Sequence, residues 1–455
     1  MTDVALAEVV AFCGGEIINV NPDVKIKKVE TDSRKDLTDC IFFALKGERF
    51  DAHDFLEQAI AANAAILCVE KGREIKKYPC WCVDDTLKTY QKLGAFLLQK
   101  AAIPTVGITG SVGKTSVKEM TRSVLEEKFG IGKVLYTEGN TNNHIGVPQN
   151  LMRLTAEHKA AVIEMGTSSF GEITVLSEIV HPDAALINTI APCHLENLIN
   201  LEGVAKEKSA IFDFAQKFAV FPADIPQTEQ LKKAAEAKKL TIRNFGKTSV
   251  SDFYYSDFSG SISGSSFVLH CGNESVVVNW SLQGEHQAQN ACGAAAIGNF
   301  FGMTLQEIAA GLQKTALPGM RAKITEKDGV HYYNDAYNAN PASMYALLKL
   351  IAECIANGEF ELKDVILLIG DMLELGENSL AEHRNILQSA SSLLPGAVIL
   401  TVGKNYAQSA ADFNVESFAD AVSAGHRLRE LLADGKWVFL KGSRSMRMEN
   451  ALIAE

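Results

Sequence analysis

The chain has 455 residues, a formal net charge of -11, 47% hydrophobic residues and 22% charged residues. This length allows about three domains of roughly 150 residues each, and the ordinary composition is that of a folded protein. The negative net charge argues against nucleic acid as a partner, because nucleic-acid binding depends on lysines and arginines that displace counterions from phosphates. Any anionic ligand must therefore be held locally.

The nine cysteines are odd in number and scattered along the chain. Cys80 and Cys82 lack a second pair at the spacing of a zinc site, so we expect free thiols in a reducing compartment, with the cytoplasm as the simplest location. No early stretch joins a basic region to an apolar run, and no segment approaches the roughly 20 apolar residues that span a bilayer. We expect neither export nor a place in a membrane.

The first part of the chain predicts a small α/β domain. The apolar runs Cys40–Leu45 and Ala64–Val69 are typical of short strands, and a helical stretch lies near residues 54–62. Acidic and hydroxyl residues open the apolar periodic run of residues 84–101, which is the pattern of a capped helix. We place the first boundary there, so that residues 1–84 form the N-terminal domain.

The second part begins with a strand, a glycine-containing loop and a helix. The strand is Thr105–Thr109, the loop is Gly110–Thr115, and the helix starts at about Lys114. This order suits phosphate binding. Further strands are predicted to end at Glu164 and around Asn188.

The pattern then becomes strand-rich and polar over residues 218–280, which indicates an added antiparallel element. An alanine-rich helix over residues 286–299 follows. We interpret residues 85–315 as a central ATPase-like domain with a phosphate-binding loop and a mostly parallel sheet.

The last part of the chain alternates helical stretches with three apolar strands: Val365–Ile369, Ala397–Val402 and Trp437–Leu440. This alternation predicts a Rossmann-like C-terminal domain over residues 316–455. In such sheets ligands bind at the carboxyl ends of strands. Here those ends carry Asp371, Gly403 and the run Lys441–Arg444.

The loop residues have the chemistry that nucleotide phosphates need. Gly110 and Gly113 let backbone N–H groups turn toward phosphate oxygens at a helix N-terminus, Lys114 supplies a cation, and Thr115 supplies a hydroxyl for Mg²⁺. Ile108 stands where the general motif has its leading glycine. A glycine-rich turn with an ordinary lysine is the alternative, but the strand and helix around the loop favour phosphate binding.

Three later residues are candidates that the pattern alone leaves open. Glu164 ends an apolar strand, where nucleotide enzymes place a metal-associated carboxylate, although a solvated glutamate is the alternative. His194 follows another strand and is as compatible with a metal ligand as with a surface histidine. Lys208, beside Lys206 and Glu207, fits a solvated helix face by pattern alone.

Six segments together resemble the Mur ligase family over essentially the whole chain. They are Thr31–Arg34, Ala44–Asp54, Gly110–Met120, Gly139–Pro148, Asn334–Pro341 and Ile369–Gly376. The family's loop is spaced as this one is, so the missing leading glycine supports the resemblance. The resemblance implies an ATP-dependent ligase that requires Mg²⁺ and activates a carboxylate as an acyl phosphate. The implied substrates are UDP-N-acetylmuramoyl-tripeptide and D-alanyl-D-alanine, with a monomeric cytoplasmic enzyme expected.

The resemblance also implies roles for individual residues. ATP would be bound by the loop and by three later residues: Gly110, Ser111, Val112, Gly113, Lys114, Thr115, Ser116, Asn290, Arg321 and Asp335. The metal ligands would be Thr115, Glu164, His194 and Lys208, and the last three form the catalytic group together with Lys114. The uridine nucleotide would face Ser33 and Arg34. The route to the reacting carboxylate would be lined by Asn140, Asn142 and Asn143.

Lys208 would have to be a carbamate, which turns a cation into a carboxylate-like ligand. A lysine cation about 4 Å from a dication is repelled by roughly 8 kcal/mol at an effective dielectric constant near 20.

Two positions depart from the family pattern: Ser168 stands where the family commonly has asparagine, and Gln287 replaces the usual asparagine after His286. Both departures bear on substrate and adenine contacts.

Two other classes of function remain as alternatives. One is a ligase of the same superfamily that adds a single amino acid, or a folylpolyglutamate synthetase, which the N-terminal domain disfavours. The other is a regulatory GTPase or a mechanical ATPase. The chain shows no Asn-Lys-x-Asp guanine signature, which argues against the GTPase.

Overall fold

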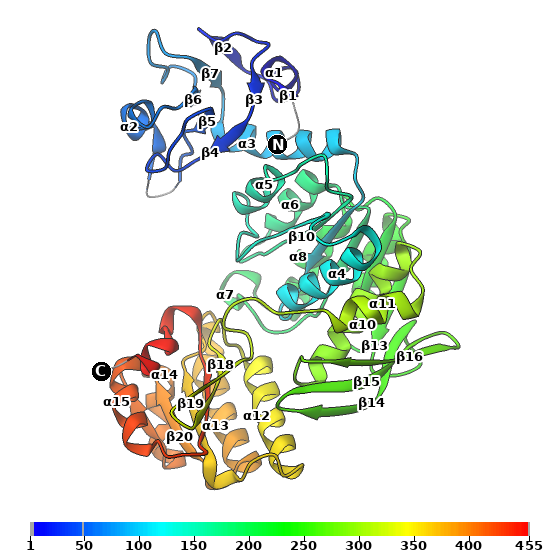
Figure 1. Cartoon of the computed structure of the whole chain (residues 1–455), viewed down its shortest axis with the longest axis vertical. Coiled ribbons are helices and arrows are strands. Elements are labelled where there is room, and N and C mark those ends of the chain that lie inside the picture. Colours follow the sequence, from blue (N-terminus) through cyan, green and yellow to red (C-terminus); the bar gives the residue numbers. More distant parts are fainter. Residues whose placement is uncertain (1–3, 48–49, 454–455) are drawn as a thin grey trace.

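The computed structural model describes residues 4–47 and 50–453, so Glu48 and Arg49 of the family-like segment Ala44–Asp54 lie outside the described residues. Three main sheets follow one another along an elongated molecule, with the N-terminal part at one end and the C-terminal part at the other (Figure 1). The predicted fold class, α/β with three units, is confirmed.

The N-terminal unit is a five-stranded sheet in the order β2-β7-β6-β5-β4, parallel except between β2 and β7. Its elements are β1 (Val4–Ala5), α1 (Leu6–Cys13), β2 (Glu16–Ile18), β3 (Lys25–Ile26), β4 (Lys28–Glu30), β5 (Cys40–Phe43), the 3₁₀ helix η1 (Ala52–Phe55), α2 (Leu56–Ala61), β6 (Ile66–Glu70) and β7 (Cys80–Val83). The strands and the helix expected near residues 54–62 are confirmed.

The central unit is a nine-stranded sheet in the order β16-β15-β14-β13-β12-β11-β8-β10-β9. Its elements are α3 (Thr86–Ala101), β8 (Thr105–Thr109), α4 (Lys114–Phe129), β9 (Val134–Tyr136), α5 (Gly146–Leu151), β10 (Ala160–Glu164), α6 (Glu172–Val180), β11 (Ala184–Ile187), α7 (Leu195–Leu198), α8 (Leu201–Ser209), η2 (Ala210–Phe212), β12 (Phe218–Pro222), α9 (Thr228–Ala237), β13 (Thr241–Gly246), β14 (Phe253–Ser261), β15 (Gly264–Cys271), β16 (Glu274–Trp280), α10 (Glu285–Phe300) and α11 (Leu305–Gln313). Only β14, β15 and β16 pair antiparallel, which confirms the added antiparallel element.

The C-terminal unit is a six-stranded sheet in the order β17-β18-β22-β19-β20-β21, parallel except between β17 and β18. Its elements are β17 (Lys323–Lys327), β18 (Val330–Asp335), α12 (Pro341–Ala356), η3 (Leu362–Asp364), β19 (Val365–Gly370), η4 (Gly376–Asn378), α13 (Ser379–Leu393), β20 (Val398–Val402), α14 (Lys404–Ala410), η5 (Ala411–Phe413), β21 (Glu416–Phe418), α15 (Ala421–Leu431), β22 (Trp437–Lys441), η6 (Arg444–Met446) and η7 (Met448–Leu452). The predicted boundaries near residues 84 and 315 fall between β7 and α3 and between α11 and β17.

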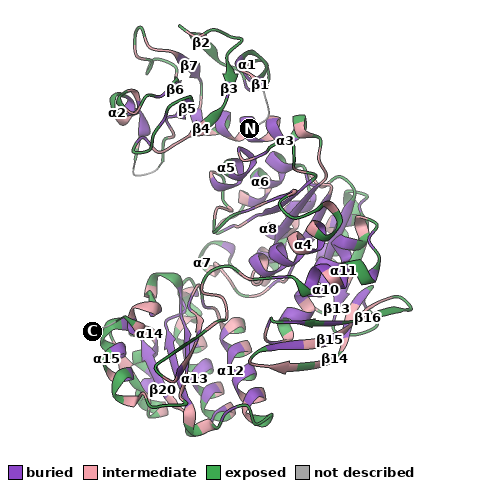
Figure 2. Cartoon of the chain, in the orientation of Figure 1, coloured by how far each residue is buried: buried purple, intermediate pink, exposed green. Residues whose placement is uncertain are grey.

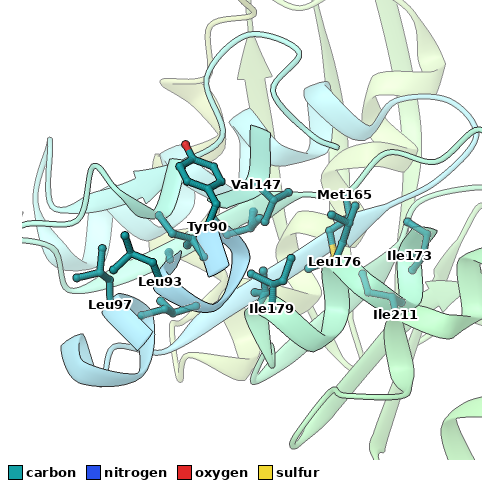
Figure 3. Close-up of a cluster of buried hydrophobic side chains, with 14 of the residues drawn as sticks. Tyr90, Leu93, Leu97, Val147, Met165, Ile173, Leu176, Ile179 and Ile211 are labelled. Carbon is teal, nitrogen blue, oxygen red and sulfur yellow. The ribbon is translucent and has the colours of Figure 1, made fainter. Parts of the chain in front are cut away.

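Helix α3 joins the N-terminal and central units through apolar side chains. It begins because the Asp85 carboxylate accepts a hydrogen bond from the Lys88 amide at 2.9 Å, as the sequence predicts. Its buried face carries Leu93 and Leu97, which belong to the same hydrophobic cluster as Ile179 of α6 (Figure 3). One continuous core therefore runs from the first sheet into the second.

The buried segments are concentrated in the central strands of each sheet, with exposed residues on the outer helix faces and loops (Figure 2). Strands β8, β10 and β11 are buried along their whole length, which accounts for their largely apolar sequences. All nine cysteines are free thiols, as predicted. Among the helices in the described ranges, none is long and apolar enough to cross a membrane.

The sequence predicted that the carboxyl ends of the C-terminal strands face a ligand site. The structure shows that not all of them do. The Asp371 carboxylate instead accepts hydrogen bonds from the backbone amides of Asn405 and Tyr406, both at 3.0 Å, at the start of α14. Gly403 is packed against this carboxylate. Asp371 and Gly403 therefore support the fold, because a buried carboxylate stabilises a helix N-terminus.

Candidate active site

The phosphate-binding loop has the geometry that its sequence predicts. Gly113 is in the left-handed region at φ 78° directly before α4. A Cβ atom there would lie 2.4 Å from the Asn188 side-chain nitrogen, so both the backbone and the space require glycine. The Lys114 ammonium donates to the Gly110 carbonyl oxygen at 2.7 Å across the loop. The backbone amides at the start of α4 are thus arranged to bind an anion.

The loop is anchored to the segment that follows β11. The Ser111 amide donates to the Thr189 carbonyl at 2.8 Å, and the Ser111 hydroxyl donates to the Ala191 carbonyl at 2.9 Å. The Asn188 side chain donates to the Val112 carbonyl and to the Asn290 side-chain oxygen, both at 2.9 Å. These contacts connect the loop to α10 and hold it in one conformation.

Glu164 lies at the centre of a polar chain beneath the loop. The Thr115 hydroxyl donates to one carboxylate oxygen at 3.0 Å, and the Asn142 side chain donates to the other at 2.8 Å. The Glu164 amide donates to the Thr137 hydroxyl at 2.9 Å. The carboxylate is only 1% exposed, so the alternative of a solvated strand-end glutamate is wrong.

Lys208 is also buried, which corrects the expectation from pattern alone of a solvated helix face. The residue is 1% exposed, and within the described residues its ammonium has no hydrogen-bond or ion-pair partner. Burial, together with the nearby Lys114 cation, lowers the pKa of Lys208 to about 8. A buried lysine without a counter-charge is costly in its charged form, so the site favours a neutral amine or a modified one.

Glu207, the neighbour of Lys208, fixes helix α8 in place. Its carboxylate accepts hydrogen bonds from the backbone amides of Gly171 and Ile173 at 2.7 and 2.8 Å, at the start of α6. The Thr167 hydroxyl donates to the same carboxylate at 3.2 Å. The position of Lys208 is therefore set by a buried carboxylate that the sequence pattern placed in solvent.

His194 meets the C-terminal unit. Its Nδ1 atom lies 3.1 Å from a carboxylate oxygen of Glu374, in the loop after β19. His194 keeps the pKa of the Glu374 carboxyl below its usual range. Both residues have positive φ angles, 50° and 66°.

The C-terminal unit makes a second contact at the loop. The Arg321 guanidinium donates to the Thr115 hydroxyl at 3.1 Å and lies 3.9 Å from the centre of the Tyr337 ring. Lys441, at the end of β22, forms an ion pair with Asp335 at the end of β18. The prediction that Lys441 faces the ligand site is consistent with its place in the cavity wall.

A cavity of about 780 Å³ lies between the central and C-terminal units. It brings together most of the residues singled out in the sequence: Ser111, Val112, Gly113, Lys114, Thr115, Ser116, Asn140, Asn142, Asn143, Glu164, His194, Asn290, Arg321 and Asp335. Gly110 directly precedes Ser111 of this wall, and Lys208, which is buried, is not among the lining residues.

Ser33 and Arg34 lie elsewhere, in the N-terminal unit. The Ser33 hydroxyl donates to the Gln58 side-chain oxygen at 3.2 Å, and Arg34 pairs with Asp32 at 2.7 Å. These two residues lie in a different unit from Asn140, Asn142 and Asn143, which line the cavity.

The donor chemistry at the loop fits Mg²⁺. The Thr115 hydroxyl and the Glu164 carboxylate are hard oxygen ligands within 3.0 Å of each other. In the part of the chain that the structure describes, no group of three or more histidine, cysteine, aspartate or glutamate side chains could hold a metal ion alone. Magnesium is often bound by one or two carboxylates plus substrate phosphates, which this arrangement would allow.

The two departures from the family pattern both line the cavity. The Ser168 amide donates to the Glu172 carboxylate at 2.6 Å, which fixes the loop before α6. The Gln287 side-chain oxygen accepts a hydrogen bond from Asn290 at 2.9 Å. Gln287 thus holds a predicted nucleotide contact in place.

The fold and the cavity define a nucleotide-binding protein in which a phosphate-binding loop faces a Rossmann-like domain. Comparison with known families agrees: the Mur ligase middle domain matches residues 108–298, and the Mur ligase glutamate ligase domain matches residues 320–444.

Relatives that align with nearly the whole chain show which family of nucleotide-binding enzymes it belongs to. The UDP-N-acetylmuramoyl-tripeptide--D-alanyl-D-alanine ligase of Escherichia coli is 37% identical over 100% of this chain and 98% of its own. MurF from Acinetobacter baumannii has a similar crystal structure, with a TM-score of 0.90, 30% identity and coverage of 99% of this chain and 98% of its own. MurF from Thermotoga maritima, solved with ADP, has a TM-score of 0.81 at 24% identity over 94% of this chain and 97% of its own. The chain belongs to the Mur ligase family and is an enzyme of the ligase class.

Several residues of the site were missed by sequence reasoning. Asn188, Glu207 and Glu374 occupy key positions, yet each is a common polar residue without a motif of its own. Glu374 lies within the family-like segment Ile369–Gly376, which was the one available signal.

Proposed function

We propose that this ligase uses ATP and Mg²⁺ to join D-alanyl-D-alanine to the terminal carboxylate of UDP-N-acetylmuramoyl-tripeptide. The observation that carries the proposal is the shared cavity, in which Lys114 and Thr115 of the loop face Arg321 and Asp335 of the next unit. The name of the 37% identical Escherichia coli relative supplies the substrates. We expect the protein to act as a monomer in the cytoplasm.

In the proposed reaction a carboxylate oxygen of the tripeptide attacks the γ-phosphorus of ATP and ADP leaves. The amine of D-alanyl-D-alanine then attacks the acyl phosphate, inorganic phosphate leaves, and the amine proton is released. Lys114 and the loop amides would stabilise the phosphoryl oxygens as charge spreads over them. Asn140, Asn142 and Asn143 would orient the reacting carboxylate, which is catalysis by positioning. ADP in the Thermotoga maritima structure supports an adenine nucleotide here.

Thr115, Glu164, His194 and modified Lys208 would hold Mg²⁺. When bound, Mg²⁺ supplies neutralisation of the β- and γ-phosphate charge. Lys208 would reach its carbamate form when the neutral amine attacks CO₂ and one proton is lost. Its burial and its pKa of about 8 support this step, because a useful fraction of the amine is neutral near pH 8.

Contacts from other parts of the chain would complete the site. Asn290, held by Gln287 and Asn188, would contact the nucleotide from α10. Arg321 and Asp335 would do so from the C-terminal unit, so that approach of this unit excludes water from the acyl phosphate. Ser33 and Arg34 would bind the uridine nucleotide in the N-terminal unit.

A competition of amine substrates tests the proposed function. With ATP, Mg²⁺ and UDP-N-acetylmuramoyl-tripeptide, we expect rapid ADP release and a new peptide bond with D-alanyl-D-alanine, and little product with single amino acids. Turnover with folate and glutamate alone, or phosphate release that ignores both peptide substrates, would overturn the proposal.

The Lys208→Ala variant tests the carbamate. We expect its activity to fall by about 10³-fold, the scale of losing one group that stabilises transition-state charge, and to recover in part with added short carboxylic acids. Lys206→Ala removes an exposed lysine from the same helix and serves as the matched control. Full activity of Lys208→Ala would refute the ligand role.

A further inference from the structure

The contact between His194 and Glu374 joins two units of the protein at the cavity. The Nδ1 atom of His194 and the Glu374 carboxylate oxygen are 3.1 Å apart. His194 comes from the segment between β11 and α7, and Glu374 comes from the loop after β19. Both residues line the cavity that also contains Lys114 and Thr115.

Both residues are held in a backbone conformation that L-amino acids rarely adopt. His194 has φ 50° and Glu374 has φ 66°, a region that is uncommon outside glycine and less common for glutamate than for histidine. Such conformations strain the backbone and persist when the surrounding structure imposes them. Two residues with this backbone conformation therefore meet at the 3.1 Å contact.

The surroundings of Glu374 explain how its backbone is held. The Leu373 amide donates to the Ser443 hydroxyl at 2.9 Å, and Leu375 is buried beside it. On the other side, a Cβ atom on Gly376 would lie 3.3 Å from the Glu196 side chain of α7. The loop is therefore fixed to its own sheet and packed closely against the helix that begins after His194.

A carboxylate at Nδ1 determines what the other ring nitrogen can do. When Nδ1 carries the proton and donates it to the carboxylate, Nε2 keeps its lone pair and the ring has one orientation. Metal-binding histidines almost always have such a partner, and the partner raises the basicity of the ligating nitrogen. Here the partner, Glu374, comes from a different unit than the proposed metal ligands, which all belong to the central unit.

We propose that Glu374 is a positioning residue that orients His194 for metal binding, so that the metal site is complete only when the C-terminal unit meets the central one. This inference rests on the proposed metal role of His194. It links approach of the two units to the assembly of the catalytic centre, without any contact between Glu374 and the metal.

A different role for the same carboxylate would be to bind the ammonium group of the amine substrate. The Glu374 side chain is 66% exposed, which would permit such a contact. The structure pairs it with His194 Nδ1 at 3.1 Å instead, and this contact favours the positioning role. The two roles predict different losses on substitution.

Mn²⁺ binding in the presence of ADP measures the metal site without turnover. We expect Glu374→Ala to bind Mn²⁺ about 10- to 100-fold more weakly than the wild type, the usual cost of losing such a partner. Glu374→Gln should lose less, because its amide oxygen still accepts from Nδ1–H. Glu377→Ala removes an exposed carboxylate from the adjacent 3₁₀ helix η4 and should bind Mn²⁺ as the wild type does.

Steady-state kinetics on the same variants separates the two roles. Unchanged Mn²⁺ affinity together with a raised KM for D-alanyl-D-alanine would overturn the inference and assign Glu374 to the amine. If the wild type with ADP binds no Mn²⁺, the proposed metal site fails, and this inference fails with it. Loss of Mn²⁺ affinity in Glu374→Ala with an unchanged KM for the amine is the result that we expect.

Discussion

The two junctions between the units of this protein differ in the kind of contact that forms them. The N-terminal and central units share one hydrophobic cluster, in which Leu93 and Leu97 of α3 pack with residues of α6 (Figure 3). The central and C-terminal units meet at the cavity through polar contacts, Arg321 with Thr115 and Glu374 with His194. A further contact joins the tip of the β14–β15 hairpin to the segment after α12, where the Ile262 amide donates to the Glu359 carboxylate at 2.8 Å and the Ile262 side chain packs against the C-terminal hydrophobic cluster.

This difference indicates which junction can respond to ligands. The stabilisation of the first junction is roughly proportional to the apolar area that is buried there. A phosphate ligand has no apolar surface that could replace these contacts. The polar groups at the second junction can exchange their partners for nucleotide phosphates and metal at modest net cost. We therefore expect the N-terminal and central units to move as one body and the C-terminal unit to move against them.

The largest effect is expected from breaking the apolar junction. Leu97 is 1% exposed, so Leu97→Ala should lower the free energy of unfolding by about 3 kcal/mol through lost burial and a cavity. Urea denaturation followed by circular dichroism measures this change, and kcat of the folded enzyme should stay within about twofold. Leu380→Ala, at an exposed leucine, is the control. A loss below about 0.5 kcal/mol would mean that α3 does not hold this junction together.

A smaller effect, on activity instead of stability, is expected at the polar junction. Arg321→Ala removes the guanidinium that reaches Thr115, and kcat/KM for ATP should fall by about 10- to 100-fold, or about 1.4–2.7 kcal/mol. The urea midpoint should barely change, because half-exposed polar contacts contribute little to stability. Lys323→Ala, at an exposed lysine of β17, is the matched control. A shifted urea midpoint with unchanged kcat/KM for ATP would mean that Arg321 contributes to stability and not to activity, which would contradict the comparison.

The parts of the site that the sequence predicts are those determined by local structure. Gly113, Lys114 and Thr115 form a strand-loop-helix unit, whose spacing alone places them at the N-terminus of α4. The cap at Asp85 is local for the same reason. The order of apolar strands likewise predicts the C-terminal sheet, since parallel buried strands have uninterrupted apolar sequences.

The remaining features depend on packing between distant parts of the chain. Lys208 and Glu207 look solvated in their own helix, and they are buried because α8 packs beside α6. Glu374 reaches His194 only after two separate sheets have formed and met. Asp371 shows the opposite error. The sequence predicted that this strand-end carboxylate faces a ligand, but it accepts hydrogen bonds at a helix N-terminus.

Isotope transfer tests the central claim, carboxylate activation by ATP at this cavity, most directly. UDP-N-acetylmuramoyl-tripeptide labelled with ¹⁸O in its terminal carboxylate would be converted with ATP and D-alanyl-D-alanine, and the released phosphate analysed by mass spectrometry. An acyl phosphate predicts one ¹⁸O atom in each phosphate formed, because the attacking carboxylate oxygen leaves with phosphorus. Phosphate without ¹⁸O, formed alongside the peptide product, would contradict the account.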